Sequence, residues 1–138
     1  MQFKKTFFSL ETRTQLYLRL FMASTNLVAL AAIVLGIDSI SMGFRLFGAV
    51  VNLLLLLYAI RPALAPSLYF RLIPWFVLFG VVFPVWRFLA AYSAGKPIDA
   101  PLIRDAIDLL LALLFASPVL KFYEAANRAK VESVAAPK

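Results

Sequence analysis

Four apolar runs divide the chain into segments close to membrane-spanning length. Leu20 to Ile37 has 18 residues with neither charge nor proline, and Leu46 to Ile60 and Leu72 to Trp86 have 15 uncharged residues each. The fourth run, Leu109 to Leu120, has only 12, so a span there must include flanking residues. A helix needs about 20 mainly apolar residues to cross a hydrocarbon core about 30 Å thick. The pattern therefore predicts four transmembrane helices.

Polar and proline-containing stretches set the limits of these helices. Residues 61–67 and 94–101 each contain two prolines, which disfavour helix at the preceding residue and predict loops. Thr12 to Gln15 has the spacing of a capping box, which predicts that the first helix begins there. Pro84 and Pro118 fall inside predicted spans, where proline kinks a helix unless neighbours satisfy the freed carbonyl groups.

These limits predict a single membrane domain over residues 1–138. We expect spans at about residues 16–37, 43–61, 70–92 and 102–121, followed by a cytoplasmic helical tail over 122–138. Because the connections are short, consecutive spans should lie side by side and run in opposite directions. The predicted fold class is an all-α integral membrane protein with four transmembrane helices in an antiparallel bundle.

Composition strengthens this prediction and excludes several kinds of chemistry. Apolar residues make up 63% of the chain and charged residues 15%, whereas soluble domains have roughly 45–50% and about 25%. With neither cysteine nor histidine, the chain offers no disulfide, thiolate nucleophile, Cys/His metal site or Ser-His-Asp triad. It also lacks the glycine-rich loops that cradle phosphates. We therefore expect no cofactor, no metal and no catalytic activity.

The net charge of +7 is read as a signal of membrane topology. Basic residues flank the apolar runs and do not gather on one polar face, so a nucleic-acid interface is not expected. For four spans, ten Lys and Arg residues fall on the side of the termini and four on the other side. Positively charged loops stay in the cytoplasm and attract anionic headgroups. This distribution predicts cytoplasmic N- and C-termini in a membrane such as the bacterial inner (plasma) membrane.

Charged residues near the outer ends of spans three and four form the first candidate site. Arg87 should lie at the depth of Asp105 and Asp108, because a short loop joins the two helices. Arg104 and Asp108 can form a further pair four residues apart. We interpret these residues mainly as structural ion pairs. The functional alternative is a proton relay or a clamp for a lipid phosphate.

Two asparagines and a few small residues could join helices within the membrane. Asn26 and Asn52 should differ in depth by about 3 Å, so we expect a hydrogen bond between their amides across the first hairpin. The alternative role is a polar step on a substrate path. Ala112 and Ala116, four residues apart, allow close helix approach.

These features favour a non-catalytic role over transport. Apolar helix surface, small residues and basic ends suit an accessory or structural subunit, or a binding partner, of a larger membrane protein complex. The expected partners are a bilayer with anionic headgroups and another membrane protein or a second copy of the chain, with the tail from Lys121 to Lys138 contributing. The alternative is a small oligomeric transporter or lipid-handling protein that uses Arg87, Asp105 and Asp108.

The predicted topology can be tested with reporter fusions. A phosphatase that is active only outside the cytoplasm should be inactive when fused after Lys138. The same reporter inserted between Ala94 and Ala100 should be active, since that loop carries few basic residues. The reverse pattern would contradict the topology.

Overall fold

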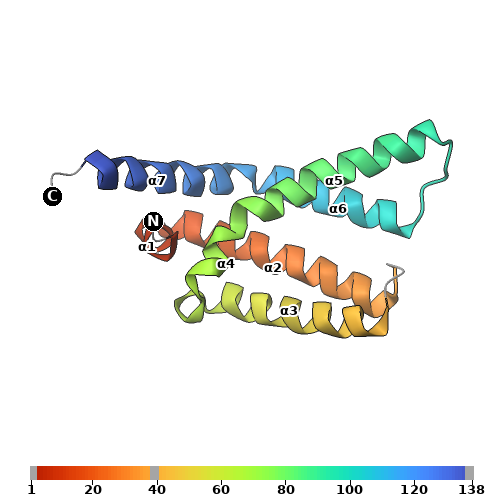
Figure 1. Ribbon diagram of the computed structural model, residues 1–138, viewed down its shortest axis with the longest axis horizontal. Coiled ribbons are helices and arrows are strands. Elements are labelled where there is room, and N and C mark those ends of the chain that lie inside the picture. Colours follow the sequence, from red (N-terminus) through yellow and green to blue (C-terminus); the bar gives the residue numbers. More distant parts are fainter. Residues whose placement is uncertain (1–2, 38–40, 136–138) are drawn as a thin grey trace.

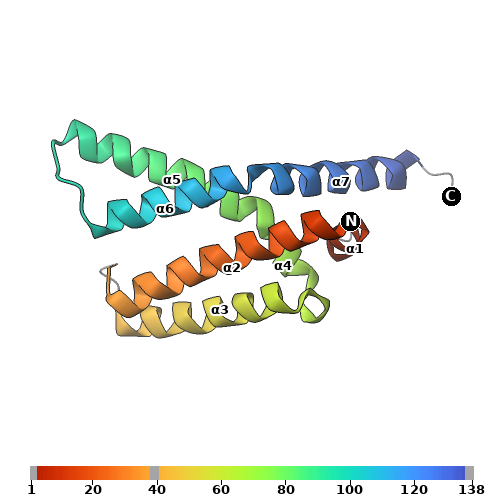
Figure 2. The same cartoon turned by 180° about the vertical axis from the view of Figure 1, so that it is seen from behind.

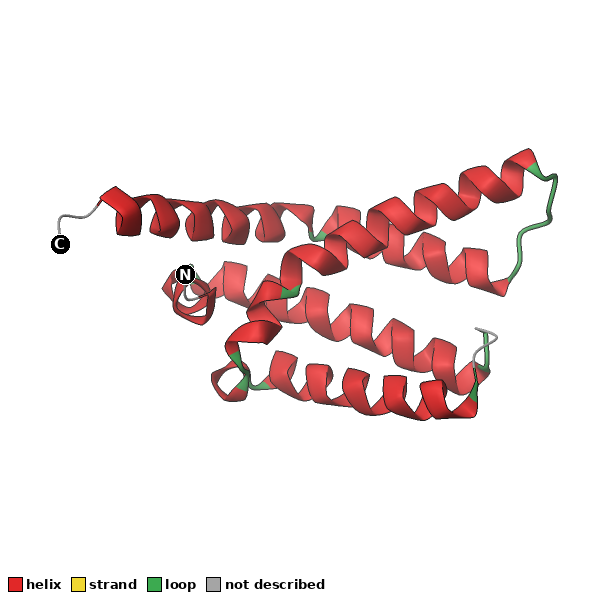
Figure 3. Ribbon diagram, in the orientation of Figure 1, coloured by secondary structure: helices red, strands yellow, loops and turns green. Residues whose placement is uncertain are grey.

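The computed structural model describes residues 3–37 and 41–135, and every element in them is helical (Figures 1 and 3). Asp38 and Lys138, which enter the charge count, lie outside the described residues. The elements are α1 (Phe3–Ser9), α2 (Thr12–Leu35), α3 (Met42–Ile60), the 3-10 turn η1 (Pro62–Leu64), α4 (Ser67–Arg71), α5 (Ile73–Ser93), α6 (Ala100–Leu114) and α7 (Ala116–Ala135).

Three helical segments are long and apolar enough to cross a membrane: α2, α3 and the segment Ser67–Ser93 formed by α4 and α5. A fourth candidate consists of α6 and α7 together, which are bent by 56° relative to each other. The apolar pattern thus correctly predicted an all-helical chain, and the described residues contain three to four candidate spans.

Two antiparallel hairpins make up the molecule (Figures 1 and 2). One consists of α2 and α3, the other of α5 and α6, and α2 packs against both members of the second hairpin. The helices α1, α4 and α7 gather at one end, which we call the terminal end. The last turns of α2 and α5 and the first turns of α3 and α6 lie at the opposite end, which we call the hairpin end.

The predicted fourth span is not one continuous helix. The helix is interrupted at Phe115, and Pro118 lies in the first turn of α7. Proline has no N–H group, and its ring clashes with the carbonyl four residues earlier, here that of Leu114. In the first turn of a new helix the missing donor costs little. Since the 15 residues of α6 span only about 22 Å, the start of α7 must complete any crossing.

By contrast, Pro84 does not interrupt α5, which continues to Ser93. Pro84 is buried, and Gly80, whose carbonyl it leaves without its usual helical donor, faces α6. A Cβ atom on Gly80 would lie 3.2 Å from the Ala112 Cβ and 3.3 Å from the Asp108 carbonyl oxygen. The absence of a side chain at Gly80 therefore sets how closely α5 and α6 approach.

The two helices whose C-terminal ends lie at the hairpin end, α2 and α5, are each terminated by a glycine in the left-handed conformation. Gly36 and Gly95 each have φ of 66°, a conformation that residues with a Cβ rarely adopt. The amide of the next residue then turns back onto the helix, from Ile37 to the Ala32 carbonyl and from Lys96 to the Ala91 carbonyl. These Schellman-type ends satisfy carbonyl groups that would otherwise lack donors.

The predicted capping box is wrong, although α2 does begin at Thr12. Glu11 occupies the cap position, and no side chain caps the helix. The Gln15 side chain instead donates to the carbonyl oxygens of Phe8 and Leu10, at 3.2 and 2.8 Å. Because α1 ends just before α2, its last carbonyl groups lie within reach and compete for the Gln15 amide.

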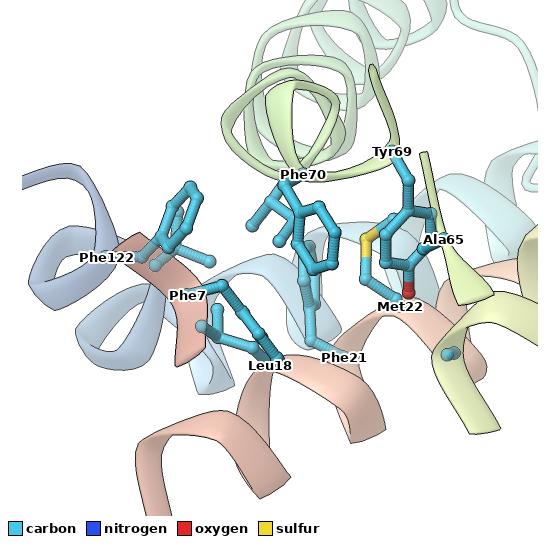
Figure 4. Close-up of a cluster of buried hydrophobic side chains, with 11 residues drawn as sticks. Phe7, Leu18, Phe21, Met22, Ala65, Tyr69, Phe70 and Phe122 are labelled. Carbon is cyan, nitrogen blue, oxygen red and sulfur yellow. The ribbon is translucent and has the colours of Figure 1, made fainter. Parts of the chain in front are cut away.

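The main hydrophobic core lies at the terminal end and is rich in aromatic rings (Figure 4). Phe7 of α1 is 1% exposed, and its ring centroid lies 5.0 Å from that of Phe70 and 6.5 Å from that of Phe122. Phe21 of α2 is also fully buried. The helix α1 turns Phe7 toward the interior of the protein. The first and last helices are thus joined through one core.

Removal of a ring from this core should destabilise the protein. Phe7→Ala leaves a cavity between α1, α4 and α7, and burial losses of this kind cost about 3 kcal/mol. Phe44→Ala is the matched control, since Phe44 on α3 is 71% exposed. Unfolding measurements in detergent should show a clear loss of stability for Phe7→Ala and little change in stability for Phe44→Ala. Equal effects would contradict the assignment of the core.

Candidate functional site

A groove of about 290 Å³ lies at the hairpin end between α5 and the start of α6. Four charged residues line it: Arg87 from α5, Lys96 from the loop, Asp99 at the start of α6 and Asp105 within α6. Trp86 forms part of its rim and is 70% exposed. Two cations and two carboxylates therefore share one small space.

The central contact of the groove is an ion pair between the two helices. Arg87 Nη1 donates to Asp105 Oδ1 at 2.9 Å. Asp105 is 3% exposed, whereas 53% of the Arg87 side chain is exposed. The second carboxylate oxygen, Asp105 Oδ2, is buried and has no hydrogen-bond partner among the described residues. The pair holds α5 and α6 together and leaves an acceptor unused.

The other two predicted charges lie within α6. Arg104 Nε is 3.8 Å from Asp108 Oδ2, and both side chains are about a quarter exposed. This spacing of four residues places them on one face of the helix. Of the two partners that the sequence allowed for Arg87, the structure brings Asp105 into hydrogen-bond distance. Asp108 contacts α5 through its carbonyl oxygen, at the position of Gly80.

Asp99 has a defined role that the sequence analysis missed. Its side chain accepts a hydrogen bond of 3.1 Å from the Leu102 amide and so caps α6. The signal is Asp99-Ala100-Pro101, an N-cap residue followed by proline in the first turn. This cap fixes the start of α6 and thereby the position of Asp105 two turns later.

The predicted hydrogen bond between Asn26 and Asn52 is wrong. Each amide donates to a carbonyl four residues earlier in its own helix, Asn26 to Met22 at 2.6 Å and Asn52 to Gly48 at 2.7 Å. A helical carbonyl one turn back is always within reach of a short polar side chain. Asn26 is fully buried, whereas Asn52 is only half-buried. The expected similarity in depth therefore did not bring the two side chains to face each other.

Two arginines also perform a task that the sequence analysis did not assign. Arg19 of α2 donates to the carbonyl oxygens of Ala59 and Ile60 at the end of α3, at 2.9 and 2.6 Å. At the other end of this hairpin, Arg45 of α3 donates to the Ile33 carbonyl near the end of α2, at 2.7 Å. Each helix thus supplies a cation to the negative end of its neighbour's dipole.

The groove has the means to bind and orient a charged group. Within residues 3–37 and 41–135, no cluster of three or more carboxylates could hold a metal ion. Arg87 and Lys96 supply donors for an anion, and Asp105 supplies an acceptor for a donor group. The arrangement suits recognition of a small polar ligand.

Loss of Arg87 should weaken the contact between α5 and α6. Arg87→Leu leaves the buried Asp105 without its cation and should cost about 1–3 kcal/mol, reduced from the cost of a fully buried pair because Arg87 is half-exposed. Arg87→Leu combined with Asp105→Leu should recover part of this loss. Thermal unfolding in detergent measures both, and Arg104→Leu should cost less because its pair is longer. A double variant no better than Arg87→Leu would contradict the pairing.

Similarity to known proteins gives no assignment for this site. Comparison of the chain with protein-family models, curated proteins and solved structures finds no match. Its function is therefore inferred from its own residues and geometry.

Proposed function

We propose that the chain is a non-catalytic protein of four membrane spans that binds another membrane protein as an accessory subunit. In this proposal both termini lie in the cytoplasm of a bacterial cell, and the spans cross its inner membrane. The partner contacts the distal part of α7. The exposure of that helix is the observation that carries the proposal.

The two halves of α7 differ in their packing. The first half contributes Pro118, Val119, Phe122 and Ala126 to the interior of the protein. From residue 127 to residue 135 the chain stays helical, yet every residue is exposed. Figure 1 shows this arm extending beyond the other helices at the terminal end. Among the described residues, the arm is thus a helical segment with no buried side chain.

The composition of the arm suits a protein partner. Val131 and Val134 are 65% and 82% exposed and are three residues apart, so they share a face of the helix. Lys130 and Glu132 lie beside them. The arm continues the 20-residue helix α7 but lacks packing of its own, and because most helical stability in proteins comes from packing, contact with a partner would stabilise it. The apolar pair would provide the contact, and the charges would provide its orientation.

The membrane-facing surface offers less specificity. In the apolar window of α3 only 6% of residues are buried, and Phe47 and Leu46 are more than 60% exposed. Lipid covers such surface as well as a protein does, so apolar area gives no drive toward association within the bilayer. Specific binding therefore has to come from the arm and from the few polar positions.

The alternative function, transport or lipid handling through Arg87, Asp105 and Asp108, requires polar groups along the depth of the membrane. The buried polar residues of the described chain are Thr6, Thr14, Asn26 and Asp105. Only Asn26 lies well inside a span and away from both ends. This sparse set favours the binding role over a transport path.

Truncation of the arm provides the test of this function. A chain that ends at Ala126 keeps the packed half of α7, so insertion and thermal stability should stay unchanged. Co-purification of a stoichiometric partner in mild detergent should fall at least about tenfold. A photoreactive residue at Val134 should give one discrete adduct in native membranes, identified by mass spectrometry. The same residue at Phe44, as the control, should give none.

Two results would contradict the proposal. One is a truncated chain that keeps its partner with full recovery. The other is movement of an ion or amphiphile by the purified protein alone in liposomes, abolished by Asp108→Asn. The second result would establish the transport function instead.

A further inference from the structure

The groove at the hairpin end carries unused hydrogen-bonding capacity of both kinds. A guanidinium has five N–H donors, and within the described residues Arg87 uses one of them, on Asp105. About half of the Arg87 side chain is exposed, and Lys96, which is also exposed, lines the same groove. The left-handed turn at Gly95 and the bond from the Lys96 amide to Ala91 fix this part of the loop. Two positively charged hydrogen-bond donors thus line the same groove.

Asp105 provides the complementary group on the inner side. Its side chain is 5% exposed, and its Oδ2 atom lacks a partner although Oδ1 binds Arg87. Buried polar atoms in native proteins nearly always have a hydrogen-bond partner. An N–H group of a ligand, reached by a small rotation of the carboxylate, would satisfy this oxygen. Since Asp105 lines the groove, a ligand there is within reach of it.

The position of the groove places it beside lipid headgroups. The segment Ser67–Ser93 has 27 residues and a length of about 40 Å, about 10 Å more than the hydrocarbon core. Arg87 lies six residues before its end, where a long side chain reaches the headgroup layer. Trp86 and Tyr92 are 70% and 88% exposed on the same turns, as is typical of side chains at this interface.

We propose that this groove binds the headgroup of a phosphoethanolamine lipid. The lipid phosphate accepts hydrogen bonds from Arg87 and Lys96, and its ammonium donates to Asp105 Oδ2. A zwitterion matches a groove that holds two cations and two carboxylates. A simple anion, by contrast, has no N–H donor for Asp105 Oδ2. A volume of about 290 Å³ suits a headgroup whose acyl chains remain outside. This site is independent of the partner that we assign to α7.

Methylation of the lipid nitrogen separates this proposal from general attraction to phosphate. Phosphocholine lipids keep the phosphate and the positive charge but have no N–H donor. Binding of short-chain lipids to the delipidated full-length protein in detergent can be measured by native mass spectrometry and by thermal shift. The phosphoethanolamine lipid should bind about tenfold more tightly than its phosphocholine analogue and raise the unfolding temperature.

Variants assign the two halves of the headgroup to their residues. Lys96→Gln, in an exposed loop, should weaken both lipids alike, whereas Asp105→Asn should remove the preference for phosphoethanolamine. If Asp105→Asn lowers stability, the comparison of the two lipids on the unchanged protein carries the test of the ammonium contact, and Lys96→Gln tests the phosphate contact. Lys130→Gln, at the terminal end, is the control and should change neither affinity. Water-soluble phosphoethanolamine should bind much more weakly than the lipid.

Three outcomes would overturn the proposal. Equal affinity for the phosphoethanolamine and phosphocholine lipids would remove the role of Asp105. Tighter binding of an anionic phosphoglycerol lipid would show that the groove selects net negative charge. Equal affinity for soluble phosphoethanolamine would assign the groove to a soluble ligand.

Discussion

The need to satisfy backbone carbonyl groups in a nonaqueous solvent shapes this protein more than any other constraint. Within lipid an unpaired carbonyl costs several kcal/mol, so every helix end near the bilayer requires a donor. The chain meets this need in two ways. Gly36 and Gly95 turn the backbone onto itself, and Arg19 and Arg45 reach across to the neighbouring helix. Because each arginine binds the other helix, satisfaction of the ends also fixes the register of the first hairpin.

The second hairpin uses side-chain charge and close packing instead. Asp99 caps α6, Arg87 binds Asp105, and Gly80 lets the two backbones approach. These contacts lie on consecutive turns of α6. The groove is a by-product of this arrangement, since the loop of residues 94–99 must pass over the ends of two helices that are already joined below it.

The sequence predicted the limits of the helices along the chain well and their rotation about the helix axis poorly. Run lengths and prolines located α2, α3 and α5 within a few residues, because the thickness of the bilayer fixes how many residues a span needs. The expectation that Arg87 and Asp105 lie close together is also met, since the two side chains form an ion pair. Asn26 and Asn52 were expected at a similar depth, yet the direction in which each side chain points around its helix axis depends on packing that no single apolar run reveals. The docking of α1 likewise arises from contacts between distant segments, whereas the break at Phe115 follows from the nearby Pro118, which the sequence already marks as a site of kinking.

The contact between α1 and α7 sets an order for biogenesis. Phe7 and Phe122 belong to the first and last helices, so the aromatic core can close only after nearly the whole chain has left the ribosome. The first hairpin, by contrast, has both of its arginine contacts once residue 60 is made. The first hairpin can therefore form early, whereas α1 can dock in the aromatic core only after α7 has been made.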